Sequence, residues 1–216
     1  MIMFFDFFKK KKKPSLPAPL NLRLGGAAEL DLLPFQMMRE QLHFNLPEGA
    51  QTIEAIGFID LGAGASISRF YTADDGFIQV STTGGYKTEN IDDIKLFMFE
   101  KTHNISSQKG ADLWASESGT IGRPEFILEG TVYNRVWDAG VSGKIEPVKL
   151  TETVHTREEG AEPYEVDHLA MLYQRQIPGT ERFEYLFSSL EFTSEDEATA
   201  VVSLGIDLDL TSMSIM

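Results

Sequence analysis

The sequence contains no cysteine, so no disulfide bond holds the fold together. It also contains no apolar run that approaches the roughly 20 residues needed by a transmembrane helix. Its first apolar stretch spans only Met1 to Phe8, includes Asp6 and precedes its lysines, which is the reverse of the order in a secretory signal. We therefore expect a cytoplasmic protein whose fold depends on a hydrophobic core.

Basic residues are scarce, because 19 lysines and arginines stand against 33 aspartates and glutamates, for a formal charge of -14. Residues 1–13 hold five of the basic residues and one acidic residue, so the remainder carries 14 basic against 32 acidic residues, or -18. Nucleic-acid binding depends on clustered lysine and arginine side chains that neutralise phosphates. The composition therefore excludes nucleic acid as an expected partner of the folded body.

The strongest local feature is the stretch FFDFFKKKKKP at residues 4–14. Apolar rings beside a lysine run can bind an anionic membrane, because the rings enter the acyl boundary while the ammonium groups stay among the headgroups. We predict that residues 1–13 form such a membrane-surface anchor. Two other interpretations stay open: the lysines contact the acidic body, or the segment is a frayed terminus that docks on it. The predicted anchor residues are Phe4, Phe5, Phe7, Phe8, Lys9, Lys10, Lys11, Lys12 and Lys13.

Residues 22–46 contain the best candidate for an α-helix. Apolar residues recur there at three- and four-residue spacing, which would place them on one helical face. These residues are Leu32, Phe35, Met38, Leu42 and Leu46. A second helix is predicted around residues 107–118.

From Thr52 onward, short runs rich in β-branched and aromatic residues alternate with turn signals, which is typical of antiparallel strands joined by hairpins. We count nine or ten such strands, and predict a β-rich α+β fold of mostly antiparallel sheet with one or two helices. Residues 21–216 are expected to form a single domain after a proline-rich linker at residues 14–20. A division near residues 119–124 is the less favoured alternative.

The clearest strand is the last one, in which apolar and polar residues alternate strictly. Its apolar residues are Val202, Leu204, Ile206, Leu208 and Leu210, and its polar face includes Asp207 and Asp209. These two carboxylates could contact a hard cation, although solvated strand charges are more common.

Recognisable catalytic motifs are lacking. The sequence has no Gly-x-Ser-x-Gly elbow, and its four histidines are scattered without a metal-ligand spacing. The glycines of LGAGAS and TTGG lack a phosphate-loop ending, so we expect hairpin turns there. No catalytic residue, metal or cofactor is predicted.

Four residues are candidates for contacts with a ligand: Arg135, His168, Tyr173 and Arg175. The two arginines stand among aromatic residues, where a guanidinium can stack, bind an anionic ligand or pair with one of the many carboxylates. We favour structural pairing for both. Strand alternation places His168 on the same face as Ala170 and opposite Tyr173, which favours a histidine packed in the core.

Several stretches together carry a family resemblance: LRLGGAAELD, LPEGAQTIEAIGFIDLGAGASISRFYTADDGFIQV, NIDDIKLFMFE, YNRVW and EVDHLAMLYQRQIPGTERFEYLF. They resemble the bacterial YjfK-like family of proteins of unknown function, from about Leu20 to the C-terminus. The resemblance implies no catalytic residues. It implies a genetic context, because genes of such proteins tend to lie near those for phage-shock-protein-A-like proteins, small membrane proteins and ligases resembling glutathionylspermidine synthetase.

The tail and the resemblance together predict a non-enzymatic adaptor of a phage-shock-like envelope-stress system. We expect it in the cytoplasm and peripherally at the inner face of the inner membrane, with an anionic membrane surface and a phage-shock-protein-A-like protein as partners. The alternative is an enzyme or substrate carrier in a polyamine or peptide ligation pathway, because an acidic body concentrates cations. A third interpretation is that the acidity serves only solubility.

Overall fold

The computed structural model describes residues 16–194 and 197–216. The predicted anchor at residues 1–13 therefore lies outside the described residues. Within them the chain forms twelve strands and two α-helices, with four short 3-10 turns. The strands are β1 (Ala27–Leu30), β2 (Gln51–Gly62), β3 (Ala65–Thr72), β4 (Gly76–Thr83), β5 (Ile91–Ile105), β6 (Glu125–Leu128), β7 (Thr131–Arg135), β8 (Val148–Thr156), β9 (Tyr164–Gln176), β10 (Phe183–Ser194), β11 (Glu197–Asp207) and β12 (Met213–Ile215). The helices are α1 (Leu33–Gln36) and α2 (Gln108–Ala115), and the 3-10 turns are η1 (Pro19–Asn21), η2 (Arg39–Gln41), η3 (Thr88–Asn90) and η4 (Leu210–Ser212).

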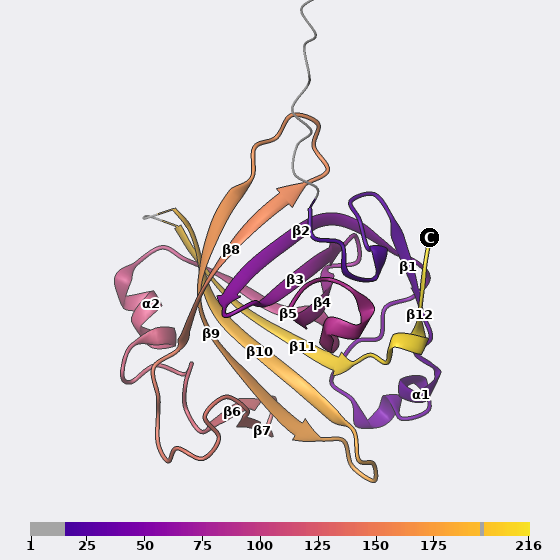
Figure 1. Ribbon diagram of the computed structural model, residues 1–216. Coiled ribbons are helices and arrows are strands. Elements are labelled where there is room, and N and C mark those ends of the chain that lie inside the picture. Colours follow the sequence, from indigo (N-terminus) through magenta and orange to yellow (C-terminus); the bar gives the residue numbers. More distant parts are fainter. Residues whose placement is uncertain (1–15, 195–196) are drawn as a thin grey trace, which may run out of the picture.

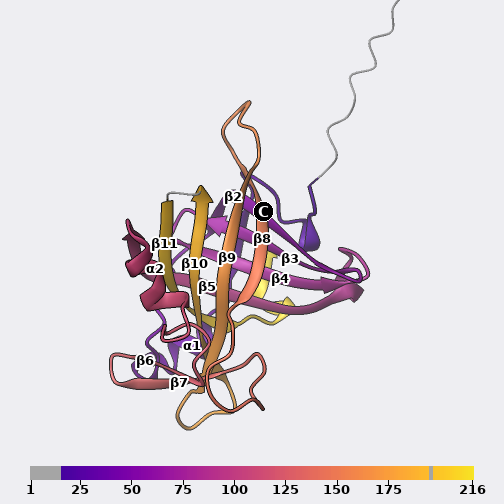
Figure 2. The ribbon, with the colours of Figure 1, turned by 90° about the vertical axis from the view of Figure 1, so that its left-hand side faces the viewer.

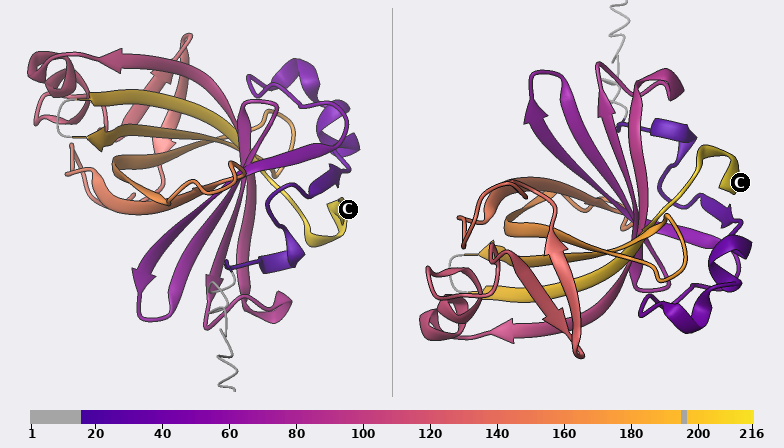
Figure 3. Two further views of the ribbon diagram at one scale, coloured as in Figure 1. Left: turned by 90° about the horizontal axis from the view of Figure 1, so that it is seen from above. Right: turned by 90° about the horizontal axis from the view of Figure 1, so that it is seen from below.

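Eight strands close into an antiparallel barrel, which confirms the predicted β-rich fold and makes it more specific. Their order is β2-β3-β4-β5-β11-β10-β9-β8, and β8 pairs back with β2. Figure 3 shows the purple strands β2–β4 and the orange-to-yellow strands β9–β11 as two wings that diverge from the side where the C-terminus lies. Outside the ring, β1 and β12 extend from β2, while β7 and β6 extend from β9.

The inner face of the barrel is largely apolar. The Arg69 guanidinium on β3 lies 4.9 Å from the centre of the Phe187 aromatic ring on β10. Strands β3 and β10 stand on opposite sides of the barrel, so these two side chains meet in its interior. The buried apolar residues on this face are Ile59, Ile67, Phe77, Phe97, Leu150, Ala170, Leu172, Tyr185 and Phe187. Side chains from both groups of strands therefore pack against one another inside the barrel.

A second apolar cluster lies on the outer face of the barrel wall. Phe70, Ile78 and Leu96 pack there with Phe44 of the N-terminal segment and Tyr133 of the β6–β7 hairpin. Helix α2 packs against the same cluster through Trp114 and its neighbours. In Figure 1, α2 and the β6–β7 hairpin lie on one side of the barrel, whereas α1, β1, β12 and the C-terminus lie on the other.

The predicted helix over residues 22–46 is wrong in its extent. Strand β1 occupies part of that segment, and helical geometry is limited to the short α1 and η2. The apolar spacing still marked a buried face, because Leu32 and Phe35 are buried and Met38 packs against the outer cluster. Pairing of β1 with β2 and β12 supplies the backbone hydrogen bonds there, so tertiary pairing prevailed over the local helical pattern.

Two other local predictions, the second helix and the glycine turn, are confirmed. Helix α2 begins after Ser107, whose Oγ accepts a hydrogen bond from the Gly110 N–H at 3.2 Å. The β2–β3 hairpin turns at Gly62 and Gly64, which have φ values of 77° and 82° that favour glycine. The last predicted strand ends earlier than expected, because Leu210 is exposed and begins η4.

No helix of the described segments combines the length and apolarity required to cross a membrane.

Candidate functional site

Four ionisable side chains from four strands meet inside the barrel: Arg69, Glu152, His168 and Glu191, here called the interior charge cluster. Glu152 Oε2 lies 2.8 Å from Arg69 Nη1 and 3.0 Å from His168 Nε2. His168 Nδ1 lies 3.4 Å from Glu191 Oε1. The Arg69 and Glu152 side chains are 2% and 0% exposed, whereas Glu191 is 27% exposed and connects the cluster to solvent.

Strand alternation explains why these residues face inward. Glu152 follows the buried Leu150 by two positions, and His168 precedes the buried Ala170 by two. The prediction that His168 shares a face with Ala170 and opposes Tyr173 is confirmed, because Ala170 belongs to the inner cluster and Tyr173 to the outer one.

Glu152 is the centre of the cluster. Its Oε1 accepts a hydrogen bond from the Tyr71 hydroxyl at 2.9 Å. Gly57 on β2 makes room for it, because a Cβ at that position would lie 1.5 Å from Oε1. Arg69 is held on its other sides by Gln79, whose Oε1 accepts from Nε at 3.1 Å, and by stacking on the rings of Phe77 and Phe187.

The cluster controls the protonation of its members. Burial alone would raise the pKa of Glu152, but Arg69 and His168 outweigh burial and lower it. Burial would likewise lower the pKa of His168, but the carboxylates of Glu152 and Glu191 raise it. The pKa of Glu191 is lowered against its burial, mainly by His168. These directions favour two carboxylates facing a guanidinium and an imidazolium, an arrangement in which opposite charges stabilise one another.

The contacts of His168 are chiefly electrostatic. Its two ring nitrogens approach Glu152 and Glu191 off the line of a good hydrogen bond. Tyr71 serves as a neutral donor, because burial and the adjacent Glu152 raise its pKa well above the ordinary value. The cluster therefore has the groups for proton transfer: Arg69 and Tyr71 donate hydrogen bonds to Glu152, whereas the His168 nitrogens make ion contacts without a hydrogen bond.

A second buried carboxylate, Glu184 on β10, connects the N-terminal segment and the β6–β7 hairpin to the barrel wall. Its Oε1 accepts from the backbone N–H groups of His43 and Phe44, both at 2.7 Å. Its Oε2 accepts from the Tyr133 hydroxyl at 2.7 Å and from Arg175 Nε at 2.6 Å. One side chain thus joins the N-terminal segment, the β6–β7 hairpin and the barrel wall.

Three of the four predicted ligand-binding residues lie on the outer face. Arg175 pairs with Glu184, and its Nη2 donates to the Gln41 carbonyl at 2.7 Å. Tyr173 is the register partner of Arg135, and its hydroxyl accepts from the Gly122 N–H at 2.8 Å. Burial raises the pKa of Tyr173 to about 12.

Arg135 organises the segment that follows β7. Its two terminal nitrogens donate to four backbone carbonyls, those of Gly122, Asp138, Val141 and Gly143. His168 lies on the opposite, inner face, so the four predicted residues do not form one site. Their role in ligand binding stays a prediction.

Three buried charges, Arg69, Glu152 and Glu184, and the half-buried Glu191 were not predicted from the sequence. A usable signal existed for Glu152, because it occupies an inward position of the alternating stretch KLTETV, where an apolar residue is expected. A charge at such a position requires a buried partner. Which residue supplies that partner depends on strand order, which the local pattern does not contain.

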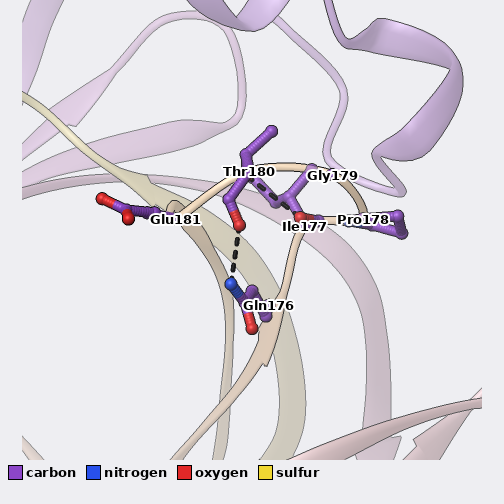
Figure 4. A pocket seen from close by; sticks show the side chains of 6 residues that line it. All are labelled: Gln176, Ile177, Pro178, Gly179, Thr180 and Glu181. Atoms are coloured by element: carbon purple, nitrogen blue, oxygen red, sulfur yellow. Dashed lines mark hydrogen bonds between the residues drawn. The ribbon is translucent and has the colours of Figure 1, made fainter.

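Among the hollows on the surface of the described residues, three have similar volumes. One, of about 610 Å³, lies against the β9–β10 turn, where Gln176 Nε2 donates to the Thr180 carbonyl at 2.6 Å (Figure 4). A groove of about 750 Å³ lies between the end of α2 and the start of β8. A groove of about 620 Å³ lies between β2 and β8. The hollow in Figure 4 is formed by a single turn, whereas the two grooves bring separate elements together.

The structure gives Asp207 another role than cation binding. Its Oδ1 lies 2.6 Å from Lys95 Nζ, and its Oδ2 accepts from the Tyr185 hydroxyl at 2.9 Å. Within residues 16–194 and 197–216, no three histidine, aspartate or glutamate side chains are placed to share a metal ion.

Comparison with known proteins places the chain in a family. The model of a family described as "Protein of unknown function (DUF2491)" matches residues 3–214. The "Uncharacterized protein YjfK" of Escherichia coli (strain K12) is 34% identical over 220 residues, which cover 99% of this chain and 98% of that relative. No solved structure gives a significant match. These matches confirm the resemblance seen in the sequence, and the chain belongs to the DUF2491 family of YjfK-like proteins of unknown function.

Proposed function

We propose that this protein is a non-enzymatic adaptor at the cytoplasmic face of the bacterial inner membrane, where residues 1–13 attach it and the acidic body binds a partner protein. The observation that carries the proposal is the mutual pairing of the interior charge cluster. Arg69 and His168 are committed to Glu152 and Glu191 inside a barrel filled with side chains. The outer surface is therefore the part of the body available for partners.

The charge distribution supports an arrangement in which the tail touches the membrane and the body stays away from it. The interior charge cluster sets Arg69 and His168 against two carboxylates, so most of the net negative charge of the body lies outside it. Such a surface is repelled by anionic lipid, whereas each of the five lysines contributes about 1 kcal/mol of attraction near the membrane. The body would then face the cytosol, where its charge favours a basic partner surface. The family context supports a phage-shock-protein-A-like protein as that partner.

Co-sedimentation with liposomes tests the membrane half of the proposal. The full chain is compared with a variant in which Lys9 to Lys13 are replaced by serine, on anionic and neutral vesicles across a salt series. We expect binding that needs the five lysines, prefers anionic lipid and weakens with salt. Substitution of the exposed Lys87 and Lys109 by serine is the matched control and should leave binding in place. Equal sedimentation of the lysine variant would refute the anchor.

Calorimetry tests the partner half. Titration of the full chain with a purified phage-shock-protein-A-like protein should give saturable heat that decreases with salt. A titration with spermidine tests the alternative of a polyamine enzyme or carrier, since saturable spermidine binding without protein binding would favour that alternative. Absence of heat with the protein partner would remove the phage-shock assignment while leaving membrane attachment as a separate result.

A further inference from the structure

The barrel is closed incompletely at one place, the seam between β2 and β8. The two strands pair over Ala55–Phe58 and Thr153–Thr156. Beyond this contact β2 continues to Gly62, and β8 begins five residues earlier at Val148. The end of β2 stays paired with β3, and the start of β8 stays paired with β9. In Figure 2, β8 lies beside β9 on the near face of the barrel.

The seam opens into the groove of about 620 Å³. Its lining residues are Phe58, Asp60, Leu61, Val148, Lys149, Leu150, Thr151 and Thr153. Leu61 would face Leu150 if the pairing continued in register, yet Leu61 is 48% exposed. The groove thus has an apolar floor continuous with the inner cluster, to which Leu150 belongs.

The groove is also lined by backbone hydrogen-bonding groups. In an antiparallel strand, the N–H and C=O groups of successive residues point alternately to the two sides. Residues 59–62 and 148–152 therefore direct part of their backbone groups toward the seam. Within the described part of the chain, no backbone hydrogen bond from another strand reaches these groups. Such edges bind extended polypeptide by adding a strand.

The charged residues at the seam indicate the chemistry of an occupant. Lys149 and Asp60 are exposed, and neither has an ion-pair partner among the described residues. An incoming strand would turn apolar side chains toward Leu61 and Leu150 and polar side chains toward solvent. An acidic side chain on its outer face would complement Lys149, and a basic one would complement Asp60, within a partner surface that is basic overall.

We propose that the seam between β2 and β8 binds an extended segment of a partner protein, which adds as a strand with apolar residues inward and an acidic residue beside Lys149. Because β2 and β8 are antiparallel, this strand would run antiparallel to one of them and parallel to the other. The inference deepens the proposed adaptor function, on which it rests, by giving the adaptor a partner site. The residues of this site differ from residues 1–13, to which the proposed membrane anchor is assigned.

A library of random eight-residue peptides displayed on phage, panned against the full chain, tests this proposal. We expect enriched peptides to alternate apolar and polar residues and to carry an acidic residue. The enriched peptide, synthesised and added to the full chain, should slow amide exchange in residues 59–62 and 148–152. Failure to enrich any peptide, or enriched peptides that leave exchange in the seam unchanged, would overturn the proposal.

A charge reversal supplies the second measurement. Lys149→Glu should weaken binding of the acidic peptide about tenfold, and a peptide with lysine in place of the acidic residue should recover that loss. Lys109→Glu, an exposed reversal on α2, is the matched control and should leave the affinity unchanged. Equal effects of the two reversals would overturn the placement at Lys149. Liposome binding is measured on the same proteins, so loss of the seam site and failure of the membrane anchor are distinguishable.

Discussion

Gly57 on β2 lies against the carboxylate of Glu152 on β8, so closely that a methyl group at position 57 would stand 1.5 Å from Glu152 Oε1. The two residues belong to the strands whose pairing closes the barrel. The absence of a side chain at Gly57 therefore permits a buried charge and ring closure in the same place.

Gly57→Ala should lower the free energy of unfolding by about 1–3 kcal/mol, because the added methyl group displaces Glu152 or separates β2 from β8. Urea denaturation measures the change. Gly140→Ala is the matched control, since a methyl group at position 140 would have no neighbour within 4 Å and Gly140 has no positive φ. Equal stability of the two variants would mean that the wall yields at Gly57 without cost.

Removal of one partner of the buried ion pair should be strongly destabilising. Arg69→Met leaves Glu152 buried without its main cation, and we expect a loss of about 3–5 kcal/mol in urea denaturation. The double variant Arg69→Met, Glu152→Gln should recover part of that loss because no uncompensated charge remains. The half-exposed pair Arg157 and Glu54 is the comparison, and its loss should cost about 0–1 kcal/mol. Similar losses at both pairs would contradict the role assigned to burial.

Stability should depend on pH in both directions. The pKa of His168 is raised from 6.5, so its contribution is fully present below pH 6.5 and is lost as the pH rises through the folded-state pKa. The pKa values of Glu152 and Glu191 are lowered from 4.5, so their contribution is present above pH 4.5 and is lost as the pH falls through the folded-state values. The cluster's contribution to stability should thus be greatest between pH 4.5 and 6.5.

His168→Gln tests the alkaline side of that profile. Urea denaturation at a series of pH values should show a smaller decline above pH 6.5 than in the parent protein. His103→Gln removes an exposed histidine and serves as the control. If the two variants keep the same decline, His168 does not carry a proton into the folded barrel.

Glu184→Gln should loosen the N-terminal segment. The neutral amide oxygen is a weaker acceptor for the Phe44 N–H and no longer pairs with Arg175, at a cost of about 1–3 kcal/mol. Hydrogen exchange at His43 and Phe44 should become about tenfold faster or more. The exposed Glu181→Gln is the control, and unchanged exchange in the Glu184 variant would show that the segment is held by apolar contacts alone.

Sequence alone determined most of the strands of this protein, because alternation and turn signals are local properties. The runs predicted from Thr52 onward coincide with β2 to β11, although a single run contains both β6 and β7 and the last run extends beyond β11, and α2 begins after its capping Ser107. The face that His168 shares with Ala170, opposite Tyr173, also followed from alternation alone. The composition and the quoted stretches were sufficient for the family resemblance, which the comparison confirmed.

Only the tertiary structure decided how those strands close and what they bring together. Ring closure joins β2 to β8, and the paired residues lie roughly 100 positions apart in the chain. The same closure brings Arg69, Glu152, His168 and Glu191 into contact, although each is an isolated charge in its own strand. Residues 22–46 likewise became a covering segment instead of a helix, since β2, β12 and Glu184 offered their backbone better partners. A local pattern specifies which face of a strand is buried, whereas the partner across the barrel is set by pairings that only the whole chain forms.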